Sequence, residues 1–394
     1  MRRVRIMFKT SKYYRLISIL TATTVPFQLS LFKSSIYAET FEKKDYIEST
    51  HHQFYIKNFA QIAGTPWGMA FLPDGRLLVT EREGRLRVID RNGRVSEPIV
   101  GIPEVRAEGQ GGLLDVTIHP NYKDNGWIYL SYSQSKSDGT SFTSIARGKL
   151  NRNSFEKLQL IYRGPIEDFS QHTQHYGSRI VFDKKNYMFF SIGDRGQRPE
   201  AQYLNTANGK IHRLFDNGTL PPDNPFVGQE DKLQSIWSWG HRNPQGLAFQ
   251  SQTGELWSTE HSPRGGDELN KIEVGDNFGW PSITYGINYN GTTITEETHA
   301  EGMTQPIHYW IPSIGVCGID FYDNDRFSKW ENHLLISSLR FGRLYRLQIK
   351  EGVIIEEEIL IETSRTRDVE TGPDGLIYVA LENPGKIVRL VPKD

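Results

Sequence analysis

The stretch Trp67-Gly-Met-Ala-Phe-Leu-Pro-Asp-Gly-Arg-Leu-Leu-Val-Thr-Glu81 reads as a strand, a turn and a second strand. Its first half is mostly apolar and leads into Pro-Asp-Gly, a tripeptide typical of tight turns because Pro fixes φ and Gly adopts a positive φ without strain. The residues after the turn are again mostly apolar and include a β-branched pair. We therefore predict a β-hairpin over residues 67–81.

The same pattern occurs five more times, and successive copies begin 45 to 72 residues apart. The other copies lie at 112–120 with 127–132, 179–182 with 187–192, 246–249 with 254–258, 318–321 with 333–337, and 368–380. Third segments that start with Gly and mix apolar with basic residues follow at 84–89, 209–214, 342–347 and 385–390. The spacing is close to the blade length of β-propellers. We predict an all-β fold, a six-bladed β-propeller over residues 50–394; two β-sandwiches would explain the strands but not the repeat.

Composition limits the classes of function. The chain has 394 residues, of which 37% are apolar and 24% charged, as in a folded globular protein. Its 46 basic and 47 acidic residues show no basic excess, so nucleic acid is not an expected partner. Cys317 is the single cysteine, which excludes an intramolecular disulfide and a multi-thiolate metal site. The sequence has no dinucleotide or phosphate-loop fingerprint, which disfavours nicotinamide and nucleotide cofactors.

The N-terminus differs from the rest of the chain. Residues 1–38 contain seven Lys or Arg and no acidic residue, and a mostly apolar run at 16–32 precedes Ala38. This layout predicts a signal peptide over 1–38, followed by an N-terminal segment at 39–49, in an exported, periplasmic protein. A retained membrane anchor is the alternative, but polar residues interrupt the apolar run, so we expect no stable membrane insertion of the mature chain. Removal of the leader changes the formal charge from −1 to −8.

Four arginines lie at the ends of repeats where a propeller gathers its loops around a central channel: Arg242, Arg340, Arg365 and Arg367. Guanidinium groups match carboxylates in bidentate geometry. Each arginine could alone be a solvated surface residue, but their equivalent positions on different blades favour a small polyanionic ligand.

His175 is the candidate general base. It lies on the loop that enters the third repeat, and imidazole is the side chain best suited to abstract a proton near neutral pH. A structural histidine is the simpler alternative. A metal pair with His172 is a weak alternative, because no carboxylate supports this spacing.

Several runs of residues carry a family resemblance. They are Gly109-Gln-Gly-Gly-Leu-Leu-Asp115, His175-Tyr-Gly, Ile192-Gly-Asp-Arg-Gly196, Gly240-His-Arg-Asn-Pro-Gln-Gly-Leu-Ala-Phe249, Asn277-Phe-Gly-Trp-Pro281 and Arg365-Thr-Arg-Asp368. With these runs the chain resembles the soluble pyrroloquinoline quinone (PQQ)-dependent sugar dehydrogenases of the glucose/sorbosone dehydrogenase family. The resemblance covers nearly everything after the leader, and it implies a six-bladed propeller that holds PQQ and Ca²⁺ over the channel.

The resemblance also implies roles for residues around the reacting atoms. His175 resembles the base that takes the proton of the anomeric hydroxyl while hydride moves to the quinone. Arg242 and Asn243 resemble residues beside the quinone oxygens, where they would stabilise developing negative charge. Gln110 resembles a polar residue near the substrate. Gln174 stands where some relatives carry Asp, which puts the orientation of the base in question.

The same comparison implies residues that hold the cofactors. Arg365 and Arg367 resemble the pair that binds the cofactor carboxylates, and Arg340 stands where the family often has Lys. Ser262, often Gly in relatives, and Pro263 match positions whose backbone carbonyls bind Ca²⁺, a hard cation that prefers oxygen ligands.

The resemblance predicts a PQQ- and calcium-dependent enzyme that oxidises aldoses at the anomeric hydroxyl to the lactone and passes electrons to an external acceptor, a quinone or cytochrome. Loop residues 285–311 are expected to select the sugar. Two alternatives stay open: a calcium-dependent propeller lactonase and a non-catalytic ligand-binding propeller.

Overall fold

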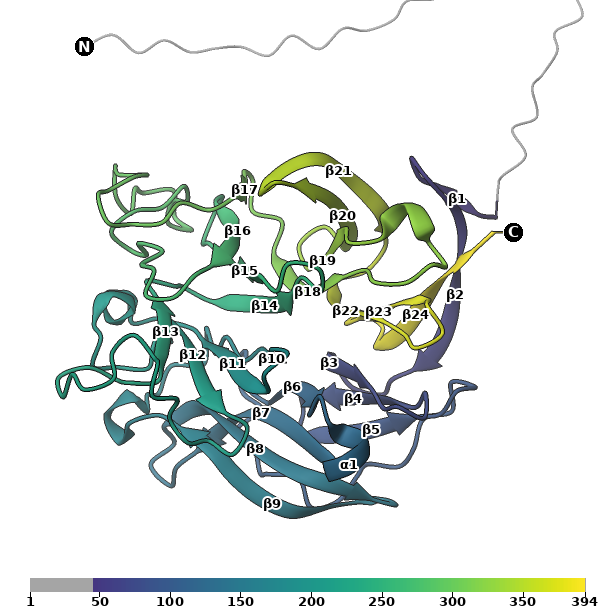
Figure 1. Cartoon of the computed structure of the whole chain (residues 1–394), viewed down its shortest axis with the longest axis horizontal. Coiled ribbons are helices and arrows are strands. Elements are labelled where there is room, and N and C mark those ends of the chain that lie inside the picture. The colour runs from purple at the N-terminus through teal and green to yellow at the C-terminus, as the bar shows by residue number, and fades with distance from the viewer. Residues whose placement is uncertain (1–44, 394) are drawn as a thin grey trace, which may run out of the picture. The chain divides into compact units, whose positions relative to one another are not determined.

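The computed structural model describes residues 45–393, which form six antiparallel sheets around a common centre (Figure 1). The predicted signal peptide at 1–38 lies outside the described residues. Within the described part, no helix is long and apolar enough to span a membrane. The fold is an all-β, six-bladed propeller, as predicted.

We call the six sheets blades 1 to 6. Blade 1 consists of β3 (Pro66–Phe71), β4 (Leu77–Glu81) and β5 (Arg85–Ile89), and blade 2 of β6 (Leu113–Ile118), β7 (Trp127–Ser135), β8 (Ser141–Asn151) and β9 (Ser154–Arg163). Blade 3 consists of β10 (Ile180–Phe182), β11 (Tyr187–Ile192), β12 (Lys210–Phe215) and β13 (Ile236–Trp239), and blade 4 of β14 (Pro244–Phe249), β15 (Leu256–Glu260), β16 (Asp267–Ile272) and β17 (His308–Trp310). Blade 5 consists of β18 (Val316–Phe321), β19 (Leu334–Ser338), β20 (Arg343–Lys350) and β21 (Val353–Glu362).

Blade 6 joins the two ends of the described chain. It contains β22 (Thr366–Thr371), β23 (Ile377–Leu381), β24 (Lys386–Pro392), β2 (Gln53–Gln61) and β1 (Ile47–Glu48). Because β2 pairs antiparallel with β24, the N-terminal strand completes the last sheet and closes the ring. The sheet thus extends N-terminal to the predicted start at residue 50.

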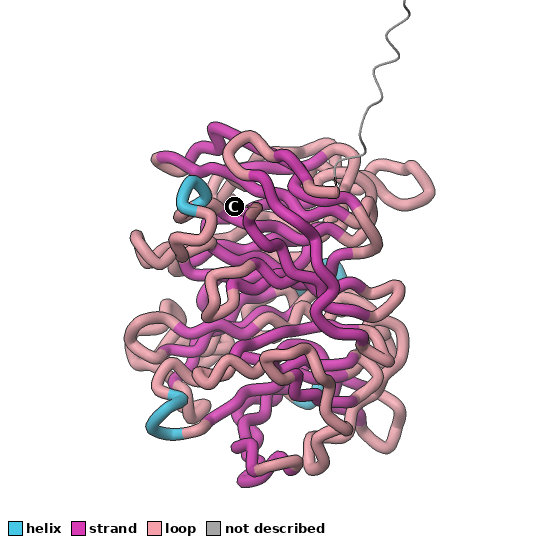
Figure 2. The backbone as a smooth tube through the Cα atoms, turned by 90° about the vertical axis from the view of Figure 1, so that its right-hand side faces the viewer, coloured by secondary structure: helices cyan, strands magenta, loops and turns pink. Residues whose placement is uncertain are grey.

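Each predicted repeat is the inner part of one blade. The first strands of the blades, β3, β6, β10, β14, β18 and β22, lie next to one another in a ring around the channel. The short helical elements are α1 (Tyr122–Asn125), η1 (Ile166–Asp168), η2 (Arg198–Gln202) and η3 (Ser328–Trp330). Seen from the side, loops gather at the two ends of the strands, so residues far apart in sequence can meet at one end (Figure 2).

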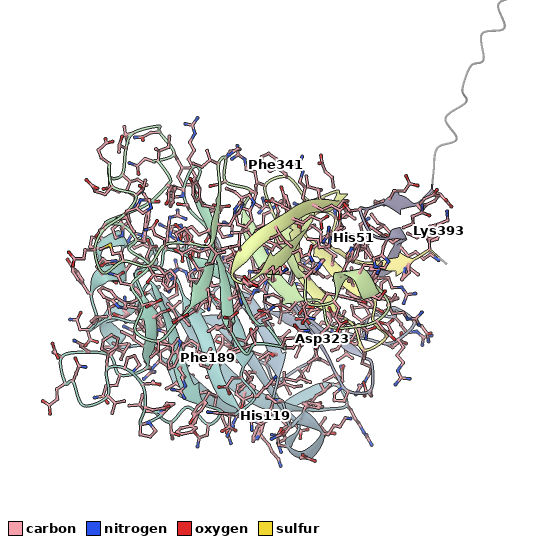
Figure 3. All side chains as sticks on the ribbon, turned by 45° about the horizontal axis from the view of Figure 1, so that its top comes forward. His51, His119, Phe189, Asp323, Phe341 and Lys393 are labelled. Atoms are coloured by element: carbon pink, nitrogen blue, oxygen red, sulfur yellow. The ribbon has the colours of Figure 1, made fainter. Side chains whose placement is uncertain are left out.

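Apolar side chains pack mainly between neighbouring blades. One apolar cluster lies at each of the six interfaces within the described residues. Between blades 3 and 4, for example, Phe189 of β11, which is labelled in Figure 3, belongs to the same apolar cluster as Leu247 of β14. Burial of these faces stabilises the ring by roughly 25 cal/mol per Å² of apolar surface. The blades therefore hold the loops at each end in defined positions.

Candidate active site

One end of the channel opens into a cavity of about 850 Å³. Loops and strand ends from all six blades line it. The nine residues to which the family resemblance assigns a role in catalysis or in holding the cofactors all line the cavity: Gln110, His175, Arg242, Asn243, Ser262, Pro263, Arg340, Arg365 and Arg367. Their convergence is a result of blade packing, since they span more than half of the sequence.

His175 is paired with a buried carboxylate. Its Nδ1 lies 2.6 Å from Oδ1 of Asp194, whose side chain is fully buried. The ionised carboxylate accepts a hydrogen bond from Nδ1–H, and this leaves Nε2 as the nitrogen that can accept another proton. Burial and the charge of Arg242 lower the pKa of His175 below its usual value, so the imidazole is neutral at pH 7.

Asp194 is held in place from two further sides. Oδ1 also accepts the backbone N–H of Gly196 at 2.7 Å, and Oδ2 accepts the indole N–H of Trp280 at 2.8 Å. Burial alone would raise the pKa of Asp194, but the hydrogen bond from His175 and the positive charge of Arg242 hold it below its usual value. Sequence reasoning gave Asp194 no role, although its run at 192–196 was recognised as a family feature. Gln174 stands where some relatives carry Asp, but His175 is still oriented, because Asp194 supplies the carboxylate.

Two polar residues fix the backbone around the base. The backbone N–H of His175 donates to Oε1 of Gln110 at 2.7 Å. The φ of His175 is +54°, in the left-handed region. The N–H of Gly177 donates to Oδ1 of Asn243 at 3.1 Å. Nδ2 of Asn243 donates no hydrogen bond within residues 45–393, so this amide can donate into the cavity. The structure thus places Gln110 and Asn243 in direct contact with the loop that carries the base.

Arg242 lies beside the pair of His175 and Asp194. Its backbone carbonyl accepts the N–H of Asp194 at 2.7 Å, and its guanidinium donates to the carbonyl of His261 at 2.9 Å. Its Nε is buried without a hydrogen-bond partner in the described structure. A buried cation with an unused donor suits an oxyanion or quinone oxygen in the cavity.

The two arginines of blade 6 share one carboxylate. Nε of Arg365 and Nε of Arg367 donate to the two oxygens of Glu382, at 2.5 and 2.7 Å. Arg367 is buried and also donates to Oε1 of Gln245 at 2.8 Å, whereas 46% of the Arg365 side chain is exposed. Glu382 aligns the pair but neutralises only one of its two positive charges. Sequence reasoning did not single out Glu382.

Arg340 lies on the adjacent blade and lines the same cavity. It is exposed, and its guanidinium donates to the carbonyl of Ser313 at 2.9 Å. The carbonyl contact orients the cation without neutralising it.

The loop at Ser262 and Pro263 presents two backbone carbonyls that have no hydrogen-bond donor among the described residues. Asp267 fixes this loop, because its Oδ1 accepts the N–H of Ser262 at 2.9 Å and its Oδ2 accepts the N–H of Gly315 at 2.6 Å. Free carbonyl oxygens on a fixed loop are suitable ligands for a hard cation. Among the described residues, no group of three or more His, Cys, Asp or Glu side chains is placed to hold a metal ion.

A buried ion-pair network lies next to Trp67 of the cavity wall. Arg179 donates to Asp115 at 3.0 Å and to Asp368 at 2.8 Å, and its guanidinium lies 4.5 Å from the ring of Trp67, a residue that also lines the cavity. The three charged residues come from blades 2, 3 and 6. They tie inner strands together across the channel, and sequence reasoning did not predict this contact.

Comparisons with known proteins agree with this architecture. Residues 63–389 match the family described as glucose/sorbosone dehydrogenase. The chain is 39% identical over 344 residues to the aldose sugar dehydrogenase YliI of Escherichia coli (strain K12), an alignment that covers 84% of this chain and 90% of the relative.

Two solved structures have the same fold. A structure described as glucose dehydrogenase matches with a TM-score of 0.83 at 39% identity, covering 86% of this chain and 99% of the other. The PQQ-bound form of an aldose sugar dehydrogenase from Streptomyces coelicolor matches with a TM-score of 0.72 at 25% identity, covering 86% of this chain and 98% of the other. The family match spans most of the chain and includes the whole cavity wall. This chain therefore belongs to the glucose/sorbosone dehydrogenase family.

Proposed function

We propose that the protein is a PQQ- and calcium-dependent dehydrogenase that oxidises the anomeric hydroxyl of aldose sugars to the lactone and delivers the electrons to an external acceptor. The observation that carries the proposal is the pair of His175 and Asp194 in a cavity rich in arginine. The relatives named as aldose sugar and quinoprotein glucose dehydrogenases support the same activity.

The donor set of the cavity fits the cofactor. PQQ is a planar tricarboxylate, and Arg340, Arg365 and Arg367 offer guanidinium groups from two adjacent blades. The unpartnered Nε of Arg242 and the free Nδ2 of Asn243 suit the quinone oxygens. When bound, PQQ accepts the hydride that leaves C1 of the sugar.

His175 provides the other half of the reaction. Nε2 takes the proton from the C1 hydroxyl as the C1–H bond breaks toward the acceptor, so a C=O bond forms and the sugar loses two electrons and two hydrogens. Asp194 holds the imidazole in the required tautomer and stabilises the imidazolium that forms. The proton then leaves to solvent, which restores the base.

The carbonyls of Ser262 and Pro263 would hold Ca²⁺ beside the cofactor, where the ion would act as a Lewis acid on the quinone. A lactonase that holds its metal by side-chain carboxylates is less well supported, because the described residues form no such cluster. We further propose that residues 1–38 are a cleaved signal peptide and that the mature enzyme works in the periplasm.

The direct test is a titration of the purified, calcium-loaded protein with PQQ, with dye reduction followed over a panel of aldoses. Saturable, PQQ-dependent reduction of the dye is expected.

His175→Ala should abolish turnover while PQQ still binds. Arg365→Ala should weaken PQQ binding by about tenfold, as expected for the loss of one charged hydrogen bond. Binding without oxidation of any aldose would contradict the sugar dehydrogenase, and absence of binding would favour the non-catalytic propeller.

A further inference from the structure

The cavity carries more positive charge than the proposed cofactors require. Its wall contains six arginines, whereas its acidic residues are Asp267 and Glu382, which leaves a surplus of four positive charges. A tricarboxylate would not neutralise this surplus, and a bound Ca²⁺ would increase it. The chain without the predicted leader has a negative net charge. The full sequence contains 47 acidic and 46 basic residues, and seven of the basic residues lie in the leader. Positive charge is therefore concentrated at the cavity, where it would attract anions.

Most of these arginines are already engaged by the protein. Arg82 donates to the carbonyls of Gly109 and Gly111, at 2.8 and 3.1 Å. The other four with protein partners are Arg242, Arg340, Arg365 and Arg367.

Arg264 is different. It lines the cavity and is exposed, but within the described chain its guanidinium forms no hydrogen bond, ion pair or aromatic contact. The family resemblance assigns it to neither the cofactor nor the metal. Its full set of donors is available to a ligand.

An exposed aromatic ring accompanies Arg264. The carbonyl of Arg264 accepts the N–H of Ile287 at 3.2 Å, and Ile287 in turn bridges Thr293 to form a short hairpin. Tyr289 lies at the tip of this hairpin, is 72% exposed and lines the cavity. The hairpin belongs to the loop 285–311 that sequence analysis assigned to substrate selection.

The hairpin also contacts the part of the cavity wall that lies near His175. Arg198 of η2 donates to Oδ1 of Asn288 at 2.7 Å and lies 5.4 Å from the ring of Trp280, which donates to Asp194. This chain of contacts holds the tip of the hairpin in a defined position relative to the active site. Tyr289 and Arg264 therefore present an apolar ring face and a free cation from one fixed segment of the wall.

We propose that Arg264 and Tyr289 form a substrate subsite for aldoses that carry an anionic group, a carboxylate or a phosphate, away from the anomeric carbon. This inference rests on the proposed sugar dehydrogenase function and names its substrate class. The ring face of Tyr289 would pack against the C–H surface of the sugar. The guanidinium of Arg264 would bind the anionic group in bidentate fashion.

The test compares glucose with glucuronic acid and glucose 6-phosphate. Steady-state oxidation of each sugar is measured in the PQQ- and calcium-loaded protein with an uncharged dye as electron acceptor at one saturating concentration, so that kcat/KM differs only through the sugar. We expect an anionic aldose to exceed glucose in kcat/KM by about tenfold or more, and the two anionic sugars distinguish carboxylate from phosphate recognition. High salt should reduce this preference.

Arg264→Gln should lower the ratio of anionic to neutral kcat/KM by about tenfold, mainly through KM, because one charge-assisted contact is lost. Tyr289→Ala should raise KM for all three sugars. Arg94→Gln is the matched control, since it removes the same charge from an exposed turn outside the cavity. A ratio that is unchanged in Arg264→Gln, or a wild-type enzyme that prefers glucose, would overturn the subsite.

Calorimetric binding of glucuronate to the loaded protein separates this inference from the proposed function. If the protein oxidises no aldose, the dehydrogenase assignment fails. The subsite is then still supported when Arg264→Gln abolishes glucuronate binding, and it is refuted when the variant binds as wild type does.

Discussion

At the scale of single residues, the site depends on a base whose proton position is set by a partner. Neutral imidazole can carry its proton on either nitrogen, and only the Nδ1–H form leaves Nε2 able to act as a base. Asp194 selects that form, and Gly196 and Trp280 donate hydrogen bonds to its two carboxylate oxygens. The carboxylate therefore has no freedom to rotate away from His175.

Asp194→Asn should lower kcat by about 100-fold or more, because the amide no longer selects the productive tautomer or stabilises the imidazolium. The shape is nearly conserved, so the Kd for PQQ should change less than about threefold. A purely structural role for Asp194 would instead change PQQ affinity and kcat together. Stopped-flow reduction and PQQ titration of the same preparations distinguish these outcomes.

The pH profile provides a second readout for the same variant. His175 acts as a base only when neutral, and its pKa lies below the usual value, so wild-type kcat/KM should be flat above about pH 6.5 and fall at lower pH. Asp194 raises the pKa of His175, so Asp194→Asn should move the acidic limb to still lower pH while the plateau falls. If kcat/KM of Asp194→Asn falls at the same pH as that of the wild type, a group other than His175 causes the fall.

At the scale of secondary-structure elements, closure of the ring depends on β2. This strand is far in sequence from β24, its neighbour in the sheet, and it carries Phe54, which is completely buried. The ring of Phe54 lies 6.2 Å from that of Phe327 and 5.8 Å from that of Trp330, both from the connection between β18 and β19 in blade 5. One side chain thus joins blade 6 to blade 5.

Phe54→Ala should lower the free energy of unfolding by about 3–5 kcal/mol, because it removes a buried aromatic side chain and leaves a cavity. Ile56→Ala on the same strand is the control, since Ile56 is 39% exposed and should cost less than about 1.5 kcal/mol. Urea unfolding followed by tryptophan fluorescence measures both. Equal losses in the two variants would mean that β2 stabilises the ring through its backbone pairing alone.

The inner strands of the blades were predictable because each repeat is a local hairpin with a recognisable turn. The outer strands were not. The strand β21 alternates exposed and half-buried residues along its first seven positions, yet it follows no Pro-Asp-Gly turn, and β13 has only four residues. The contribution of β2 to blade 6 was invisible for a different reason, since pairing between the two ends of a chain leaves no local signal.

At the scale of the whole molecule, the site itself is a product of the ring. The family resemblance identified the residues that line the cavity, but not the contacts between them. Asp194 lies 19 residues after His175, beyond a complete hairpin, and Glu382 lies 15 residues after Arg367. Only the folded blades bring these pairs together, which is why composition and motif spacing did not predict them.

Packing six inner strands around one axis also concentrates carboxylates in the channel. Asp115, Asp320, Asp368 and Glu370 all lie on inner strands, and Arg179 is the cation that pairs with two of them. Burial raises the pKa of Asp115 and of Asp320 to about 6 and raises the pKa of Glu370 well above its usual value. Each of these groups binds a proton more tightly in the folded protein than in the unfolded chain.

Asp320 can test this charge arrangement. Its Oδ2 accepts hydrogen bonds from the N–H and the hydroxyl of Thr371, at 2.8 and 2.5 Å. The amide oxygen of an Asn side chain can accept the same two hydrogen bonds. The folded pKa of Asp320 is raised, so its contribution to stability is fully present below the unfolded value near 3.8 and is lost as pH rises through about 6. Asp320→Asn should therefore stabilise the protein by about 1–2 kcal/mol at pH 8 and by little at pH 4.

Asp325→Asn removes an exposed charge from the same blade and should change the free energy of unfolding by less than about 0.5 kcal/mol at both pH values. Urea unfolding at the two pH values measures the difference, and a gain at pH 8 that persists undiminished at pH 4 would place the effect in packing and not in ionisation.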